Sequence, residues 1–126
     1  MTASRRQEPF RYQFTTPESC LFQISEINGN VIESRHARAD LIDIHKSGCK
    51  LAAQLDLRIE INHVKLLIDF PFAEEAPLLV SGEVRWQLQE HNRYLYGVQF
   101  IVDAELKERI KAELRKLAGS KKINAV

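Results

Sequence analysis

The sequence predicts a mainly β fold, a small antiparallel barrel with one C-terminal α-helix. Several short segments alternate apolar and polar residues, as strands with one buried face do. Clusters of turn-forming residues separate these segments, and a sheet of this kind avoids open edges by closing on itself. After Asp103 the apolar residues recur at helical spacing, so a single helix ends the domain.

Two hairpins are predicted by their turns. The first turn is Asn28-Gly29-Asn30, between the segments CLFQISEI and VIESR, because a Gly beside Asn readily takes the positive φ of a tight turn. The second hairpin joins ADLIDI to CKLAAQL through residues 45–48. Asp43 and His45 lead into this loop, so it carries polar side chains that can contact a ligand.

Three further segments have the period of two that is typical of strands. They are residues 64–70, 78–88 and 94–101. The polar cluster at residues 89–92 joins the last two segments as a hairpin. Together with the first two hairpins, these segments give five or six antiparallel strands.

Trp86 is expected in the core of the barrel. It shares its face of the strand with Val84 and Leu88, and large aromatic side chains on such a face are mostly buried. A stacking platform for a ligand is the alternative interpretation. The same reasoning places further aromatic residues in the core, namely Tyr94, Tyr96 and Phe100.

The helix is predicted over residues 103–118, with Asp103 as its N-terminal cap and Gly119 as its stop. Its polar face carries the i,i+4 pairs Glu105–Arg109 and Arg109–Glu113, which are ordinary on a solvated surface. We expect the other face to pack on the sheet, with binding to a membrane or a partner as the alternative. That apolar face consists of Leu106, Ile110, Leu114 and Leu117.

The length and composition indicate one soluble globular domain over residues 1–126. The formal charge of +1 does not attract a long polyanion, so any anion site must be local. No apolar run is long enough to span a membrane, and the N-terminus has no signal-peptide core, so we expect a cytoplasmic protein. Residues 1–12 are expected to be a flexible arm bearing arginines, and residues 119–126 a frayed tail.

Catalytic and metal-binding motifs are absent from the sequence. It has no nucleophile motif, Walker or dinucleotide glycine pattern, or paired-histidine motif, so we do not expect an enzyme. Cys20 and Cys49 lack the spacing of zinc ligands and the four histidines are scattered, so no metal site or cofactor is expected. Both cysteines are interpreted as buried thiols, because a reducing compartment disfavours a disulfide.

The N-terminal segment SRRQEPFRY places Arg5, Arg6 and Arg11 just before the first strand. An arginine fork binds a phosphate through two parallel bonds and can also stack on a purine, so the segment can act as a phosphate clamp. Taken without other motifs, an arginine pair of this kind fits a solubilising tail better than a clamp.

Four pieces of the sequence together resemble the PilZ family. They are RRQEPFR, DIHKSG, GEVRW and YGVQF, and their order and spacing match the family from about Arg5 to the end of the helix. The resemblance implies a six-stranded barrel that serves as a receptor for cyclic di-GMP, a bacterial second messenger. It also implies that the arm arginines hold the phosphates, and that Asp43 and Gly48 belong to a loop that contacts a guanine edge.

The residues of this loop agree with such a role. Asp43 suits a pair of guanine protons or an arm arginine, and Gly48 suits a backbone angle that other residues resist. Asp43 as a plain turn former is the alternative interpretation.

The sequence departs from the family pattern in two places. Four residues separate Arg6 from Arg11 where the family has three, which displaces one arginine. His45 occupies the position of the loop serine, and Ser47 is out of register with that position. The imidazole can replace the serine as a hydrogen-bonding group, block the guanine contact by its bulk, or be an ordinary turn residue.

Two classes of function remain open. The first is a sensor that closes its arm over cyclic di-GMP and relays the second-messenger level to a partner protein, in motility, surface polysaccharide or biofilm control as the family suggests. The second is a degenerate adaptor that does not bind nucleotide and acts through protein contacts alone. Binding of single-stranded nucleic acid is a weaker third alternative, because the net charge is near zero and the aromatic residues lie on the apolar face. The sequence predicts neither the partner nor the oligomeric state.

Overall fold

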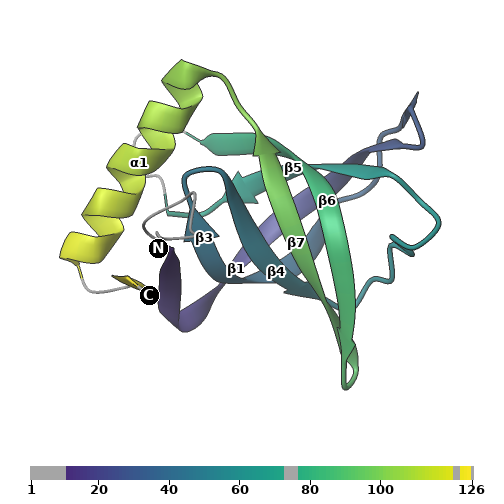
Figure 1. Ribbon diagram of the computed structural model, residues 1–126, viewed down its shortest axis with the longest axis horizontal. Coiled ribbons are helices and arrows are strands. Elements are labelled where there is room, and N and C mark those ends of the chain that lie inside the picture. The colour runs from purple at the N-terminus through teal and green to yellow at the C-terminus, as the bar shows by residue number, and fades with distance from the viewer. Residues whose placement is uncertain (1–10, 73–76, 121–122, 126) are drawn as a thin grey trace, which may run out of the picture.

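A computed structural model describes residues 11–72, 77–120 and 123–125. In this part of the chain the helix is not long and apolar enough to cross a membrane. The elements, shown in Figure 1, are β1 (Tyr12–Ile27), β2 (Asn30–Val31), β3 (Ala37–His45), β4 (Gly48–Ala53), β5 (Val64–Phe70), β6 (Leu78–Glu90), β7 (Arg93–Ile101), α1 (Ala104–Gly119) and β8 (Ile123–Ala125).

Six of these strands form a closed antiparallel barrel. Their order is β1-β3-β4-β7-β6-β5, and β5 pairs with β1 to complete the ring. The short strands β2 and β8 pair with opposite ends of β1. Figure 1 shows α1 beside one end of the barrel, close to the start of β1. The fold class predicted from the sequence is therefore confirmed.

Two tight turns depend on residues in the left-handed region of φ. In the β1–β2 turn, Asn28 has a φ of 51° and Gly29 a φ of 85°, as the Asn-Gly pair predicted. In the β6–β7 turn, His91 has a φ of 54°, and Glu90 pairs with Arg93 beside it. Both hairpins form where their turn residues predicted them.

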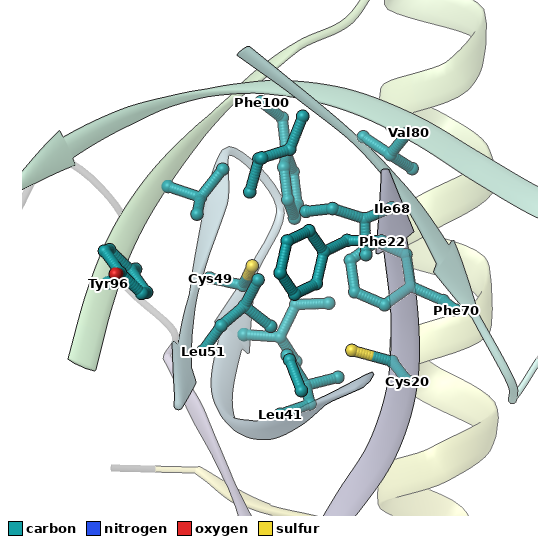
Figure 2. Close-up of a cluster of buried hydrophobic side chains, with 14 of the residues drawn as sticks. Cys20, Phe22, Leu41, Cys49, Leu51, Ile68, Phe70, Val80, Tyr96 and Phe100 are labelled. Atoms are coloured by element: carbon teal, nitrogen blue, oxygen red, sulfur yellow. The ribbon is translucent and has the colours of Figure 1, made fainter. Parts of the chain in front are cut away.

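The barrel interior is filled by apolar side chains from every strand of the ring (Figure 2). Tyr96 is among the largest of these side chains and is 1% exposed. Its hydroxyl donates to the carbonyl of Leu55 at 2.5 Å and accepts from the amide of Leu57 at 2.9 Å, so its polar end is satisfied. Burial raises the pKa of Tyr96 to about 12. Tyr96 and Phe100 are core residues as predicted, and Tyr94 packs against the core while half-buried.

Cys20 and Cys49 are buried free thiols, as expected, and both lie within the core shown in Figure 2. Burial, reinforced by the Asp40 and Asp69 carboxylates, raises the pKa of Cys20 to about 12. Burial likewise raises the pKa of Cys49 well above its usual value. Because the thiolate is the reactive form, both buried thiols are poor nucleophiles in the folded protein.

The prediction that Trp86 lies in the core is wrong. Its side chain is 44% exposed, whereas Val84 on the same strand is 5% exposed. The register between β6 and β7 shifts between Val84 and Trp86, so the extra residue Arg85 forms a β-bulge there. An inserted residue reverses the alternation that follows it, and this turns Trp86 and Leu88 outward.

The helix begins as predicted, because the Asp103 side chain accepts a hydrogen bond of 2.8 Å from the amide of Leu106. It ends one residue later than expected, at Gly119. The assignment of Glu113 to the solvated face is wrong, since this residue is only 8% exposed. Glu113 lies three residues after Ile110 and four before Leu117, which places it on the buried stripe of the helix.

The two ends of the chain also differ from the expectation. Part of the expected tail 119–126 is strand β8, which pairs with the first residues of β1. Ile123 is 2% exposed, and its burial explains why the chain end is held to the barrel. Tyr12, expected in the arm, is the first residue of β1. The rest of the expected flexible arm, residues 1–10, lies outside the described residues.

Candidate ligand-binding site

A pocket of about 280 Å³ opens on the outside of the barrel where β3, β4, β7 and β6 lie side by side. We call it the outer pocket. Three of the six residues predicted as ligand-binding, Arg11, Asp43 and His45, line it together. Its full lining is Arg11, Asp43, His45, Ser47, Cys49, Lys50, Arg85, Trp86, Gly97, Val98 and Gln99.

The strand register builds one wall of the outer pocket. Asp43 pairs with Lys50 between β3 and β4, Lys50 pairs with Gly97 between β4 and β7, and Gly97 pairs with Trp86 between β7 and β6. These four residues form one row across four strands, with side chains on the same face of the sheet. Arg11, the residue just before β1, also lines this pocket. Strand register thus brings four of the lining residues together from distant parts of the sequence.

Asp43 is nearly buried, with 8% of the residue exposed. Its carboxylate forms an ion pair with Lys50, with 3.5 Å between Oδ2 and Nζ. A carboxylate that is withdrawn from water needs such a partner, and it remains a strong acceptor for a ligand proton donor that replaces the lysine. Asp43 lies within β3, so it is not the plain turn former that the sequence also allowed.

His45 lies at the end of β3 with its ring in the outer pocket. The amide of Ser47 donates to His45 Nδ1 at 3.3 Å. A neutral ring with this nitrogen as acceptor carries its proton on Nε2, so Nε2 is a hydrogen-bond donor. The carbonyl of Ser47 accepts from the amide of Phe100 at 2.8 Å, which fastens the loop to the end of β7.

Gly48 is required for a close approach and not for an unusual backbone angle. Among the described glycines, only Gly29 has a positive φ, so the expectation of a special angle at Gly48 is wrong. A Cβ on Gly48 would lie 2.4 Å from the carbonyl oxygen of Val98 and 3.3 Å from His45 Nε2. Glycine therefore lets β4 pack against β7 while the imidazole covers its free side.

Trp86 is the functional candidate that the sequence misplaced. Its indole lies directly over Gly97, because a Cβ on Gly97 would be 2.0 Å from Trp86 Nε1. The missing side chain of Gly97 thus makes the notch in which the indole is seated, while 44% of Trp86 stays exposed. Lys50 and Arg85 were also missed, although Arg85 is already paired with Glu83 at 2.9 Å. The motif GEVRW contains Arg85 and Trp86 and could have drawn attention to both. The motif does not predict the bulge that turns Trp86 outward, because the bulge is a property of the pairing between β6 and β7.

Arg5 and Arg6 lie outside the described residues, so their position relative to the outer pocket stays a prediction. In the part of the chain that the structure describes, no group of three or more His, Cys, Asp or Glu side chains could hold a metal ion.

A larger hollow of about 510 Å³ lies elsewhere along β3 and β4 and also contains basic residues. Arg93 in this hollow is already paired with Glu90 at 3.0 Å and lies 3.8 Å from Asp40. Arg38 is exposed there. None of the six residues predicted as ligand-binding lines this hollow, whereas three of them line the outer pocket, which is therefore the candidate site.

No curated protein matches the chain. The family model described as PilZ domain matches residues 4–118. The chain belongs to the PilZ domain family. Both the barrel and the order of its motifs agree with this membership.

Three solved structures resemble this PilZ domain in fold. The K. pneumonia protein MrkH in its apo state is 20% identical, with a TM-score of 0.64, over 95% of this chain and 55% of that chain. The Bacillus subtilis inhibitor of motility MotI/DgrA is 17% identical, with a TM-score of 0.60, over 93% of this chain and 53% of that chain. The PilZ domain of YcgR from Escherichia coli with c-di-GMP is 11% identical, with a TM-score of 0.57, over 94% of this chain and 99% of that chain. The chain spans about half the length of the first two.

Proposed function

We propose that the outer pocket binds cyclic di-GMP and that the domain relays the level of this second messenger to a partner protein. The observation that carries the proposal is the convergence of Arg11, Asp43 and His45 with the exposed indole of Trp86. Cyclic di-GMP combines two phosphates with two guanines, and the pocket offers cations, an acceptor and an aromatic surface together. Membership of the PilZ family and the c-di-GMP in the YcgR structure add support.

Each residue has a distinct role in this proposal. Arg11, together with Arg5 and Arg6, pairs with the phosphates through guanidinium forks. Asp43 accepts the guanine N1 and N2 protons after Lys50 turns from it to a phosphate. Trp86 stacks on a guanine ring, a contact worth about 1–3 kcal/mol per base. Gly48 keeps the loop backbone close to the ligand.

The alternative function is a degenerate adaptor that acts only through protein contacts. One observation favours it: the His45 ring stands over Gly48, where the family pattern has a smaller serine. In the adaptor the ion pair between Asp43 and Lys50 is permanent and closes the guanine site.

We further propose a regulatory role without catalysis, in the bacterial cytoplasm, with an unidentified protein as the output. Motility or biofilm control is the proposed setting, and the similar protein MotI is named an inhibitor of motility. No nucleic acid polymer is expected as a partner, because the net charge is +1.

Calorimetry with cyclic di-GMP distinguishes the two functions. The sensor predicts saturable heat with cyclic di-GMP and much less with cyclic di-AMP, which lacks the guanine N1 and N2 protons that Asp43 accepts. The adaptor predicts no heat with either nucleotide from protein that is shown to be folded. That second result would remove the sensor proposal.

A further inference from the structure

A second cavity, of about 230 Å³, lies under α1 between the helix, the start of β1 and the residues after β5. We call it the helix cavity. Its lining includes the aromatic residues Phe14 and Phe72, the carboxylates Glu18 and Glu113, and Lys116 and Leu117 of the helix. None of these residues belongs to the outer pocket.

Glu113 is out of place for a residue that only supports the fold. It lies on the buried stripe of α1 between Ile110 and Leu117, and only 8% of it is exposed. Its partner is Lys116, at 3.5 Å between Nζ and Oε2, and the lysine side chain is 62% exposed. An apolar residue at this position would avoid the cost of withdrawing a carboxylate from water, so the fold itself does not require a charge here.

The same helix provides a matched comparison. Glu108 and Lys111 have the same i,i+3 spacing, but their atoms are 2.6 Å apart and the Glu108 side chain is 64% exposed. Glu108 is an exposed carboxylate with a short contact to its lysine, whereas Glu113 is a buried carboxylate whose contact to its lysine is longer, at 3.5 Å. Of these two glutamates, only Glu113 is buried and lines a cavity.

The aromatic lining adds a second property that suits a cation. The rings of Phe14 and Phe72 have centroids 6.4 Å apart and an interplanar angle of 35°. Phe72 also stacks on Phe70 at 5.3 Å, which holds it in place. Faces of aromatic rings attract organic cations, and this attraction is greater where water is excluded. The two carboxylates and the two phenyl rings that line this small cavity therefore both favour a cation as its ligand.

We propose that the helix cavity binds a guanidinium or primary ammonium group on a short alkyl chain. The cation pairs with Glu113 in place of Lys116, its alkyl part contacts Phe14 and Phe72, and Glu18 lies at the same cavity. Either a free organic cation or an arginine or lysine side chain of a protein can supply this group.

The test is an NMR titration of the full chain with n-butylguanidinium, using n-butylurea as a neutral probe of nearly the same shape. We expect saturable shifts of the Phe14 and Phe72 ring signals with n-butylguanidinium at millimolar concentrations and none with n-butylurea. No shift with either probe, or equal shifts with both, would overturn the proposal.

Three variants locate the bound cation. Glu113→Gln keeps the shape but removes the charge, so n-butylguanidinium should bind at least about tenfold more weakly. Glu108→Gln removes an equal charge from the exposed part of α1 and should leave binding unchanged. Lys116→Ala frees Glu113 from its partner and should tighten binding several-fold. Unchanged binding in folded Glu113→Gln would refute the assignment.

A further probe separates the two sources of the cation. If N-acetylarginine N-methylamide competes with n-butylguanidinium for the cavity, a peptide-borne arginine side chain fits there and a protein partner is supported. If it does not compete while n-butylguanidinium binds, the site takes a free organic cation.

Discussion

The outer pocket and the helix cavity have opposite electrostatic character within one small domain. The outer pocket has three basic side chains, Arg11, Lys50 and Arg85, and one carboxylate, Asp43. The helix cavity has two carboxylates and one lysine. The formal charge of the whole chain is +1, and this number does not reveal that basic residues predominate at one site and acidic residues at the other. Net charge therefore limits long polyanions as partners, but it does not describe local sites.

The two sites also differ in how they are built. The outer pocket depends on strand register and on two close approaches, of Gly48 to the carbonyl of Val98 and of Gly97 to the indole of Trp86. The helix cavity depends on one carboxylate on an otherwise apolar helix stripe. Substitutions that move the backbone or an aromatic ring should therefore affect the outer pocket. Substitutions that remove a single charge should affect the helix cavity.

The largest expected effect is that of removing both arm arginines. In Arg5→Ala/Arg6→Ala, cyclic di-GMP should bind at least about tenfold more weakly, because each charge-assisted bond is worth roughly 1.5–3 kcal/mol. Calorimetry measures this, with Arg35→Ala/Arg58→Ala as a control that removes the same charge from residues outside the outer pocket. Equal weakening in both double variants would mean that only overall charge matters.

Gly97→Ala tests the notch that seats Trp86. The new Cβ would lie 2.0 Å from Trp86 Nε1, so the half-exposed indole must move away. We expect roughly tenfold weaker binding of cyclic di-GMP, as a lost stacking contact costs about 1–3 kcal/mol. Tryptophan emission should shift as well, while n-butylguanidinium binding in the helix cavity should not change. Full affinity in this variant would exclude Trp86 as a base-stacking surface.

His45→Ser restores the family residue in the loop. We expect cyclic di-GMP to bind a few-fold more tightly, because the smaller side chain uncovers Gly48. Titration calorimetry of this variant beside the parent measures the change. Weaker binding would show instead that Nε2 of the imidazole donates to the guanine, an interaction worth about 1 kcal/mol.

Glu113→Leu is expected to have the smallest effect on the outer pocket and only a small effect on stability, although it removes the carboxylate that we propose binds a cation in the helix cavity. Replacing a buried ion pair by an apolar side chain on an apolar stripe should stabilise the fold by about 1 kcal/mol in urea unfolding. Glu108→Leu, on the exposed part of the helix, should change stability by less than about 0.5 kcal/mol. Glu113→Leu should also keep cyclic di-GMP binding intact, and a loss of that binding would show that the two sites are coupled.

Most of the fold follows from the sequence because its signals are local. The Asn28-Gly29 turn, the alternation in residues 64–70 and the Asp103 cap each depend on a few neighbouring residues, and all three are observed. The residues that were placed wrongly depend on strand pairing, which a local sequence pattern does not reveal. The bulge at Arg85 turns Trp86 outward, and the pairing of β8 with β1 joins residues more than a hundred positions apart.

The candidate site was predictable where motifs carry it. Arg11, Asp43 and His45 were chosen from motifs, and they meet in one pocket. Lys50 belongs to no motif and enters the site only through its pairing with Asp43. Glu113 followed the i,i+4 pattern of a solvated face, and only the packing of α1 on the barrel reveals its burial.

Trp86 fluorescence tests the central claim most directly, because Trp86 is the one tryptophan in the sequence and lines the outer pocket. Titration with cyclic di-GMP should change its emission in a saturable way, with the affinity that calorimetry gives and no comparable change with cyclic di-AMP. An unchanged emission at concentrations where calorimetry shows full binding would place the nucleotide elsewhere and contradict the account.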